Sequence, residues 1–164
     1  MIFDVIDARR LFVILKAEFE IWIQDREHHT AEAISLILMT NHLREWIAPG
    51  YNPDRKGRWR PDPPVTPEQR FSREVYNDPN FKIVRAIANG TKHAKERQES
   101  TPHSSSVKYA PGTEGLLHLG SVGGEEIFTG IPIEHLVDNQ PLETVLAPII
   151  DLYRRWFEPP ENSN

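Results

Sequence analysis

The sequence predicts a mainly α-helical protein, an antiparallel helical bundle with one β-hairpin appended near the C-terminal helix. Several long segments place apolar residues three and four positions apart, which is the spacing of an amphipathic helix. One stretch, from about 115 to 134, instead has two short β-prone runs around a glycine-containing turn. A lone hairpin of two strands is only marginally stable, so we expect it to pack on the helices.

The length and the composition suit one domain. The 164 residues can bury a core without cross-links, and we expect a single helical domain over residues 1–158 followed by a flexible tail, 159–164. The chain has no cysteine, which excludes disulfides, thiolate metal sites and thiol nucleophiles and fits a reducing compartment. Charges interrupt the apolar N-terminal region, so we expect neither a signal peptide nor a membrane span, and a cytoplasmic location.

The helices are expected in the following order. A first amphipathic helix covers residues 5 to 25, and a second begins at Thr30 as its N-cap and runs to Ala48, before Pro49 and Gly50. After a proline-rich loop over 51–67, a short helix with Pro67 in its first turn extends to Tyr76. Further helices are expected over 79 to 95 and over 142 to 157.

Two connecting regions complete the expected organisation. Residues 98 to 113 are rich in Ser, Thr, Pro and Gly, which indicates a flexible loop. The hairpin that follows would pair 117–119 with 127–131 around the glycine turn at 121–124.

A polar row on the helix over 79–95 is the best candidate for a functional site. Arg85, Asn89 and His93 step by four residues and so share one side of the helix, beside an apolar stripe formed by Phe81, Val84, Ile87 and Ala88. A histidine can act as general base or acid on RNA, while Arg85 and Lys92 would stabilise charge on phosphoryl oxygens. Asn89 would orient the histidine or the phosphate. This chemistry requires neither metal nor cofactor.

The run from Asn89 to His93 resembles the polar-residue-to-histidine part of the motif in HEPN-superfamily proteins, many of them toxin or defence ribonucleases. In that family an arginine directly precedes the polar residue, whereas here Ala88 does, and the upstream arginine is Arg85. Small bacterial and phage proteins are also similar, with a His-Leu-x-Glu-Trp segment, here residues 42–46, ahead of Ala-Asn-x-x-Lys-His, here residues 88–93. The resemblance implies a homodimer whose paired motifs form one cleft, and a further protein partner or an antitoxin is compatible with it.

Other residues have two readings each. Asn89, Lys92 and His93 would also suit a plain helix C-terminus. His42 shares a helical row with Ile34, Leu38 and Trp46, which predicts that it faces inward, as a core residue or as a binding residue near His93. The basic segment with Arg58, Trp59 and Arg60 suits contact with single-stranded RNA, although such charge runs are often simply solvated.

Three functions follow from these features. The first is a metal-free HEPN-like ribonuclease acting as a homodimer. The alternative is a non-catalytic helical interaction module, which the apolar first and last helices favour. The third, a metal-dependent bundle enzyme, would use His42 and Glu45 with His28, His29 or His93. The net charge of −5 requires that any RNA bind at a local basic patch.

Overall fold

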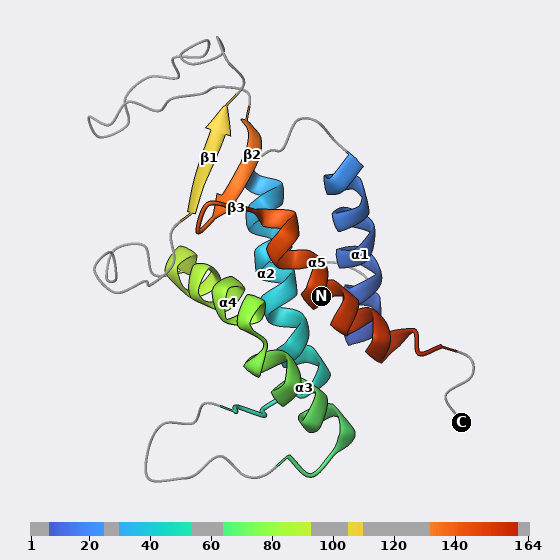
Figure 1. The fold of residues 1–164 in the computed structure, drawn as a ribbon. Coiled ribbons are helices and arrows are strands. Elements are labelled where there is room, and N and C mark those ends of the chain that lie inside the picture. Colours follow the sequence, from blue (N-terminus) through green and yellow to red (C-terminus); the bar gives the residue numbers. More distant parts are fainter. Residues whose placement is uncertain (1–6, 25–29, 54–63, 93–104, 110–131, 161–164) are drawn as a thin grey trace.

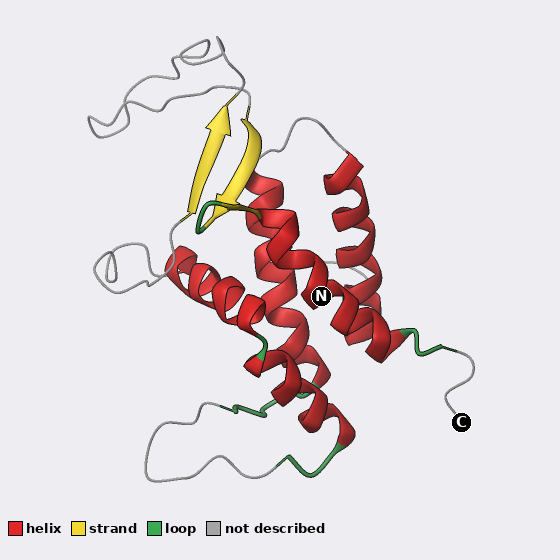
Figure 2. Ribbon diagram, viewed as in Figure 1, coloured by secondary structure: helices red, strands yellow, loops and turns green. Residues whose placement is uncertain are grey.

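The computed structural model describes residues 7–24, 30–53, 64–92, 105–109 and 132–160. These residues form a helical bundle with a small antiparallel sheet (Figures 1 and 2). In chain order the elements are α1 (Ala8–Gln24), α2 (Thr30–Ile47), α3 (Pro67–Asn77), α4 (Pro79–Lys92), β1 (Ser105–Tyr109), β2 (Pro132–Val137), β3 (Gln140–Pro141) and α5 (Leu142–Phe157). The fold class predicted from the sequence is therefore confirmed. None of the described helices is long and apolar enough to cross a bilayer.

The helix α2 is the centre of the bundle and contacts α1, α3, α4 and α5. The last helix, α5, closes the core by packing against α1, α3 and α4 as well. Aromatic stacking joins the two ends of the described chain, because Phe12 of α1 and Phe157 of α5 have ring centroids 4.9 Å apart. The fully buried side chains of the core include Phe12, Leu15, Leu36, Leu43, Val75, Phe81, Val84, Leu146, Ile149 and Tyr153.

The orientation of α2 differs from the expectation. Its buried residues are Ala33, Leu36, Ile37, Thr40, Asn41, Leu43, Arg44 and Ile47. The row that was expected to face inward is instead partly exposed, with Ile34 at 37%, Trp46 at 42% and the His42 side chain at 37%. The prediction that His42 and Trp46 are core residues is wrong, because the helix turns its Thr40 and Arg44 side inward instead.

Local sequence signals explain where α3 begins and where the chain turns toward α4. The Thr66 side chain accepts from the backbone N–H of Gln69, and the Gln69 side chain accepts from the Thr66 N–H, which together form a capping box. Pro67 occupies the first turn, as predicted. The Asp78 carboxylate then accepts from the N–H groups of Asn80 and Phe81 at the start of α4.

The sheet lies at one end of the bundle, opposite α3, and leads directly into α5 (Figure 1). Strand β1 pairs with β2 in antiparallel register, Ser105 opposite Val137 and Lys108 opposite Glu134. The sheet corrects one prediction, because β1 lies within the 98–113 segment that was expected to be a loop. The expected hairpin strands at 117–119 and 127–131 lie outside the described residues.

A two-residue turn joins β2 to β3. Asp138 and Asn139 have φ values of 50° and 62°, and Val137 pairs with Gln140 on either side of them. Asp and Asn tolerate this left-handed conformation better than most residues, and two such residues in succession match the turn that suits the twist of a hairpin. The turn directs the chain into α5 without an intervening loop.

Candidate functional site: a charged cluster of α2, α3 and α4

The helix α4 carries the polar row that the sequence singles out. Phe81, Val84 and Ala88 are fully buried, which confirms the apolar side of this helix. Arg85 is half-buried beside that side, and Asn89 is exposed. Within the described residues, α4 extends to Lys92. His93, and the basic residues Arg58, Trp59 and Arg60, lie outside the described residues.

Arg85 is held against the tyrosine at the end of α3. Its guanidinium carbon lies 4.2 Å from the centroid of the Tyr76 ring. The guanidinium of Arg44, from α2, also lies over this ring, 5.6 Å from its centroid. A cation over an aromatic face is stabilised by the ring quadrupole, by roughly 0.5–2 kcal/mol depending on desolvation. Tyr76 therefore brings two positive charges from different helices to one place.

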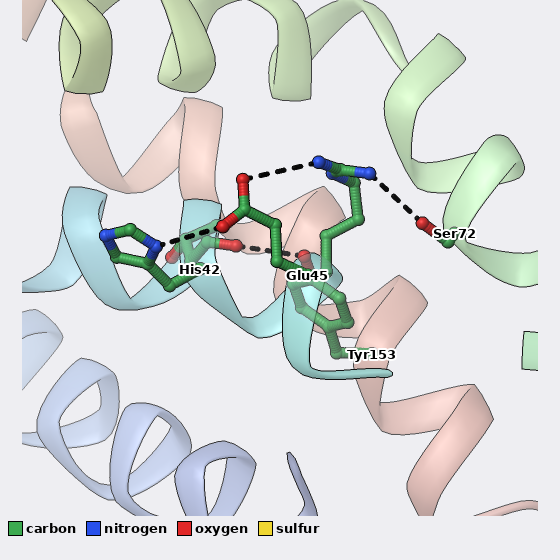
Figure 3. Close-up of polar contacts among 6 residues, drawn as sticks. His42, Glu45, Ser72 and Tyr153 are labelled. Carbon is green, nitrogen blue, oxygen red and sulfur yellow. Dashed lines mark hydrogen bonds and ion pairs between the residues drawn. The ribbon is translucent and has the colours of Figure 1, made fainter. Parts of the chain in front are cut away.

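Arg44 is the buried member of this pair. Its side chain is 8% exposed, and its Nη1 donates to the Oγ of Ser72 at 3.2 Å. Its Nη2 lies 3.5 Å from Oε1 of Glu45 (Figure 3). Within the described part of the chain, Arg44 Nε has no hydrogen-bond partner. Burial lowers the pKa of Arg44, which the nearby Glu45 and tyrosines oppose, but an arginine stays protonated at physiological pH.

Glu45 connects Arg44 to His42. Its Oε2 lies 3.4 Å from Nδ1 of His42, and Figure 3 shows the carboxylate between the imidazole and the guanidinium. Glu45 is 52% exposed, so this part of the cluster meets solvent. The contacts run in sequence from His42 through Glu45, Arg44 and Tyr76 to Arg85. They physically join the 42–46 segment to the helix that carries Asn89.

A buried hydrogen bond next to this cluster holds α2 against α5. The hydroxyl of Tyr153, a fully buried residue of α5, donates to the backbone carbonyl of Thr40 at 2.9 Å. Burial raises the pKa of Tyr153 far above its ordinary value, and the charge of Arg44 opposes this only in part. Tyr153 is therefore a neutral donor at any physiological pH, and it ties α5 to the helix that presents Arg44 and Glu45.

Two positive charges lie close together in this cluster. Two guanidiniums share one ring, and the charge of Arg85 itself lowers the pKa of Arg44. Glu45 is the carboxylate that contacts Arg44, and it is half-exposed and 3.5 Å away. Arg85 is half-buried whereas Arg44 is buried, so Arg85 is the more accessible of the two cations.

Sequence reasoning did not find all of these residues. The sequence indicated Glu45 as a possible metal ligand and Arg44 only as part of the segment 42–46, and it did not single out Ser72 or Tyr76. One signal was available, because Ser72 and Tyr76 are four residues apart and so share one side of α3. The sequence offered no sign that Arg44 would be buried against that side.

The described residues contain no group of three His, Asp or Glu side chains able to hold a metal ion. His28, His29 and His93, which the metal-dependent reading would require, lie outside them. Comparisons with protein-family models, with curated proteins and with solved structures give no significant match to this chain.

Proposed function

We propose that the chain is a HEPN-like, metal-independent endoribonuclease that acts as a cytoplasmic homodimer, as a toxin or defence protein. The observation that carries the proposal is the stacking of Arg85 on Tyr76 beside the buried Arg44. This contact holds the Arg85 cation on the side of α4 that also carries Asn89. A positioned cation next to a polar side chain is what binding of a phosphate requires. The helical bundle is the fold that the HEPN resemblance implies.

In this proposal each residue of the polar row has one role. His93 removes the proton of a ribose 2′-hydroxyl, whose oxygen forms a bond to phosphorus while the bond to the leaving 5′-oxygen breaks. The second protomer's copy of this histidine protonates that oxygen, so the products are a 2′,3′-cyclic phosphate and a 5′-hydroxyl. Arg85 and Lys92 stabilise the charge on the phosphoryl oxygens, and Asn89 orients the phosphate.

RNA would reach the site along residues outside the polar row. His42 is partly exposed and lies in the contact series that ends at Arg85, which suits a binding role. Arg58, Trp59 and Arg60 offer positive charge and a stacking surface for single-stranded RNA. Such local cations are needed because the chain as a whole carries a charge of −5.

Cleavage of RNA in EDTA tests the proposal. The parent protein, His93→Ala and Arg85→Ala are incubated with varied RNAs, with Arg73→Ala, an exposed arginine of α3, as the matched control. We expect cleavage by the parent and the control, loss in His93→Ala, and a fall of roughly 10²–10⁴-fold in Arg85→Ala. Circular dichroism verifies that every variant is folded. Cleavage that survives His93→Ala, or that EDTA abolishes, would contradict a metal-free site at His93.

The composite cleft is tested separately by oligomeric state. Sedimentation at micromolar concentration is expected to show a dimer, and a monomer that still cleaves RNA would remove the need for a second protomer. If none of the RNAs is cleaved by any protein in the series, the non-catalytic interaction module becomes the better reading of the same fold.

A further inference from the structure

A groove between α1 and α2 has a different chemistry from the charged cluster. It encloses a pocket of about 360 Å³. Its walls are formed by Ile14, Glu18, Ile21, Trp22, Ala31, Glu32, Ser35, Leu36 and Met39. None of these residues belongs to the series from His42 to Arg85, and most of the large ones are apolar.

The lining residues are spaced as they are where two helices form a groove that a third helix packs into. The α1 wall uses positions 14, 18 and 21, and the α2 wall uses 32, 35 and 39, all steps of three and four. His42 and Trp46 continue the same row on α2, because they follow at steps of three and four. From Glu32 to Trp46 this row is about 21 Å long, which is the length of roughly four helical turns.

Two large apolar side chains, one in the groove and one at the end of this row, meet solvent. Ile21 is 60% exposed and Trp46 is 42% exposed. The one hydroxyl in the wall, Ser35 Oγ, donates to the Ala31 carbonyl of its own helix at 2.8 Å. The Ser35 hydroxyl therefore already has a partner for its proton and is not available as a donor to a ligand. A contact that covers Ile21 and Trp46 would be stabilised by removing their surface from water.

The charges along the groove select the kind of occupant. Its two ionisable lining residues, Glu18 and Glu32, are both acidic and come from opposite walls. RNA would be repelled there, and a second copy packed by the same groove would bring carboxylates toward carboxylates. The nearest basic residue along α1, Lys16, pairs instead with Glu158 at 3.0 Å. A helix with basic residues flanking an apolar stripe complements both the floor and the walls.

We propose that the groove between α1 and α2 binds a basic amphipathic helix of a partner protein. The occupant places its apolar stripe over Ile14, Ile21 and Met39 and its lysines or arginines beside Glu18 and Glu32. The residues that line the pocket are separate from Arg85 and His93, so binding there does not depend on ribonuclease activity, although the row on α2 continues to His42. The proposal holds whether or not the chain cleaves RNA.

Two fluorescent 18-residue peptides test this surface by anisotropy. Both carry leucines at steps of three and four on a helix-forming background. One has lysines on the flanking positions, and its twin has glutamates at the same places. We expect the lysine peptide to bind at least roughly tenfold more tightly than the glutamate twin. Equal binding of the twins, or no binding of the lysine peptide, overturns the proposal.

Substitutions then locate the binding. Ile21→Ser is expected to weaken binding of the lysine peptide about tenfold. Ile23 is a similarly exposed isoleucine of α1 outside the groove, and Ile23→Ser is expected to leave binding unchanged. The double variant Glu18→Lys and Glu32→Lys should reverse the preference toward the glutamate peptide. Binding that is indifferent to Ile21→Ser places the peptide elsewhere and overturns the proposal. Self-association abolished by Ile21→Ser, without peptide binding, would assign the groove to a second copy instead.

Discussion

The guanidinium of Arg85 lies 4.2 Å from the centroid of the Tyr76 ring, so α4 and α3 are joined by a cation on an aromatic face. Tyr76→Leu removes the ring from both Arg85 and Arg44, whereas Tyr76→Phe retains it. We expect the leucine variant to be less stable than the phenylalanine variant by about 1 kcal/mol in urea unfolding. Equal unfolding free energies of the two variants would show that the ring contact does not stabilise the fold.

Ser72 is expected to matter because it accepts from a buried charge. Ser72→Ala leaves Nη1 of Arg44 without this acceptor, and we expect a loss of about 1–3 kcal/mol in the free energy of unfolding. In an Arg44→Met background the same substitution should cost much less, since the buried charge is gone. A double-mutant cycle with no coupling between positions 44 and 72 would refute the role of this hydrogen bond.

The raised pKa of the buried Tyr153 predicts that the stability of the fold decreases at alkaline pH. Burial raises its pKa in the folded protein, while the unfolded chain titrates near the ordinary tyrosine value of about 10. The stabilisation is therefore complete below pH 10 and is lost above it, because the unfolded state releases the proton first. The slope approaches about 1.4 kcal/mol per pH unit for this one group. Denaturant titrations from pH 9 to 11.5 measure it, and Tyr153→Phe should lack this part of the slope.

The tryptophans of α1 and α2 differ in burial and can be compared directly. Trp22 is 3% exposed and Trp46 is 42% exposed. We expect Trp22→Ala to cost about 3–5 kcal/mol, as truncation of a core aromatic does, and Trp46→Ala to cost less than about 1.5 kcal/mol. Thermal and urea unfolding of both variants measure the difference. A larger loss for Trp46→Ala than for Trp22→Ala would contradict the orientation of α2.

The capping box at Thr66 is a local test of α3. Thr66→Ala removes the acceptor for the Gln69 N–H, and we expect a cost of about 0.5–2 kcal/mol. Thr66→Ser keeps the oxygen and should stay near the parent protein. Helix α3 presents both Ser72 and Tyr76, so hydrogen exchange in residues 67–77 should increase in the alanine variant. Unchanged exchange and stability would mean that Pro67 and the packing of Phe71 alone define the helix start.

The helices could be predicted because their signals are local. The break before Pro79, the start at Pro67 and the bounds of the last helix all follow from residues within one or two turns. Strand β1 could not be predicted in this way. Its sequence, Ser-Ser-Val-Lys-Tyr, becomes a strand through pairing with residues more than twenty positions later.

The candidate site was only partly predictable for a related reason. Helix α2 has apolar residues on nearly all sides, so its sequence does not say which side faces the core. The structure buries Thr40 and Arg44 and leaves Ile34 and Trp46 exposed. That choice depends on the partners of Arg44, which come from α3, and on Tyr153 from α5. Contacts between distant elements do not appear in any one segment of the sequence.

The pairing of α1 with α5 determines when, during synthesis, the protein can complete its fold. Phe12 stacks on Phe157, and Lys16 pairs with Glu158, which lies 142 residues later in the sequence. During synthesis, α1 therefore leaves the ribosome long before the helix that covers it. A nascent chain arrested before α5 would present Phe12 to solvent or to a chaperone. Release of the C-terminal helix should thus be the step at which the chain becomes resistant to proteases.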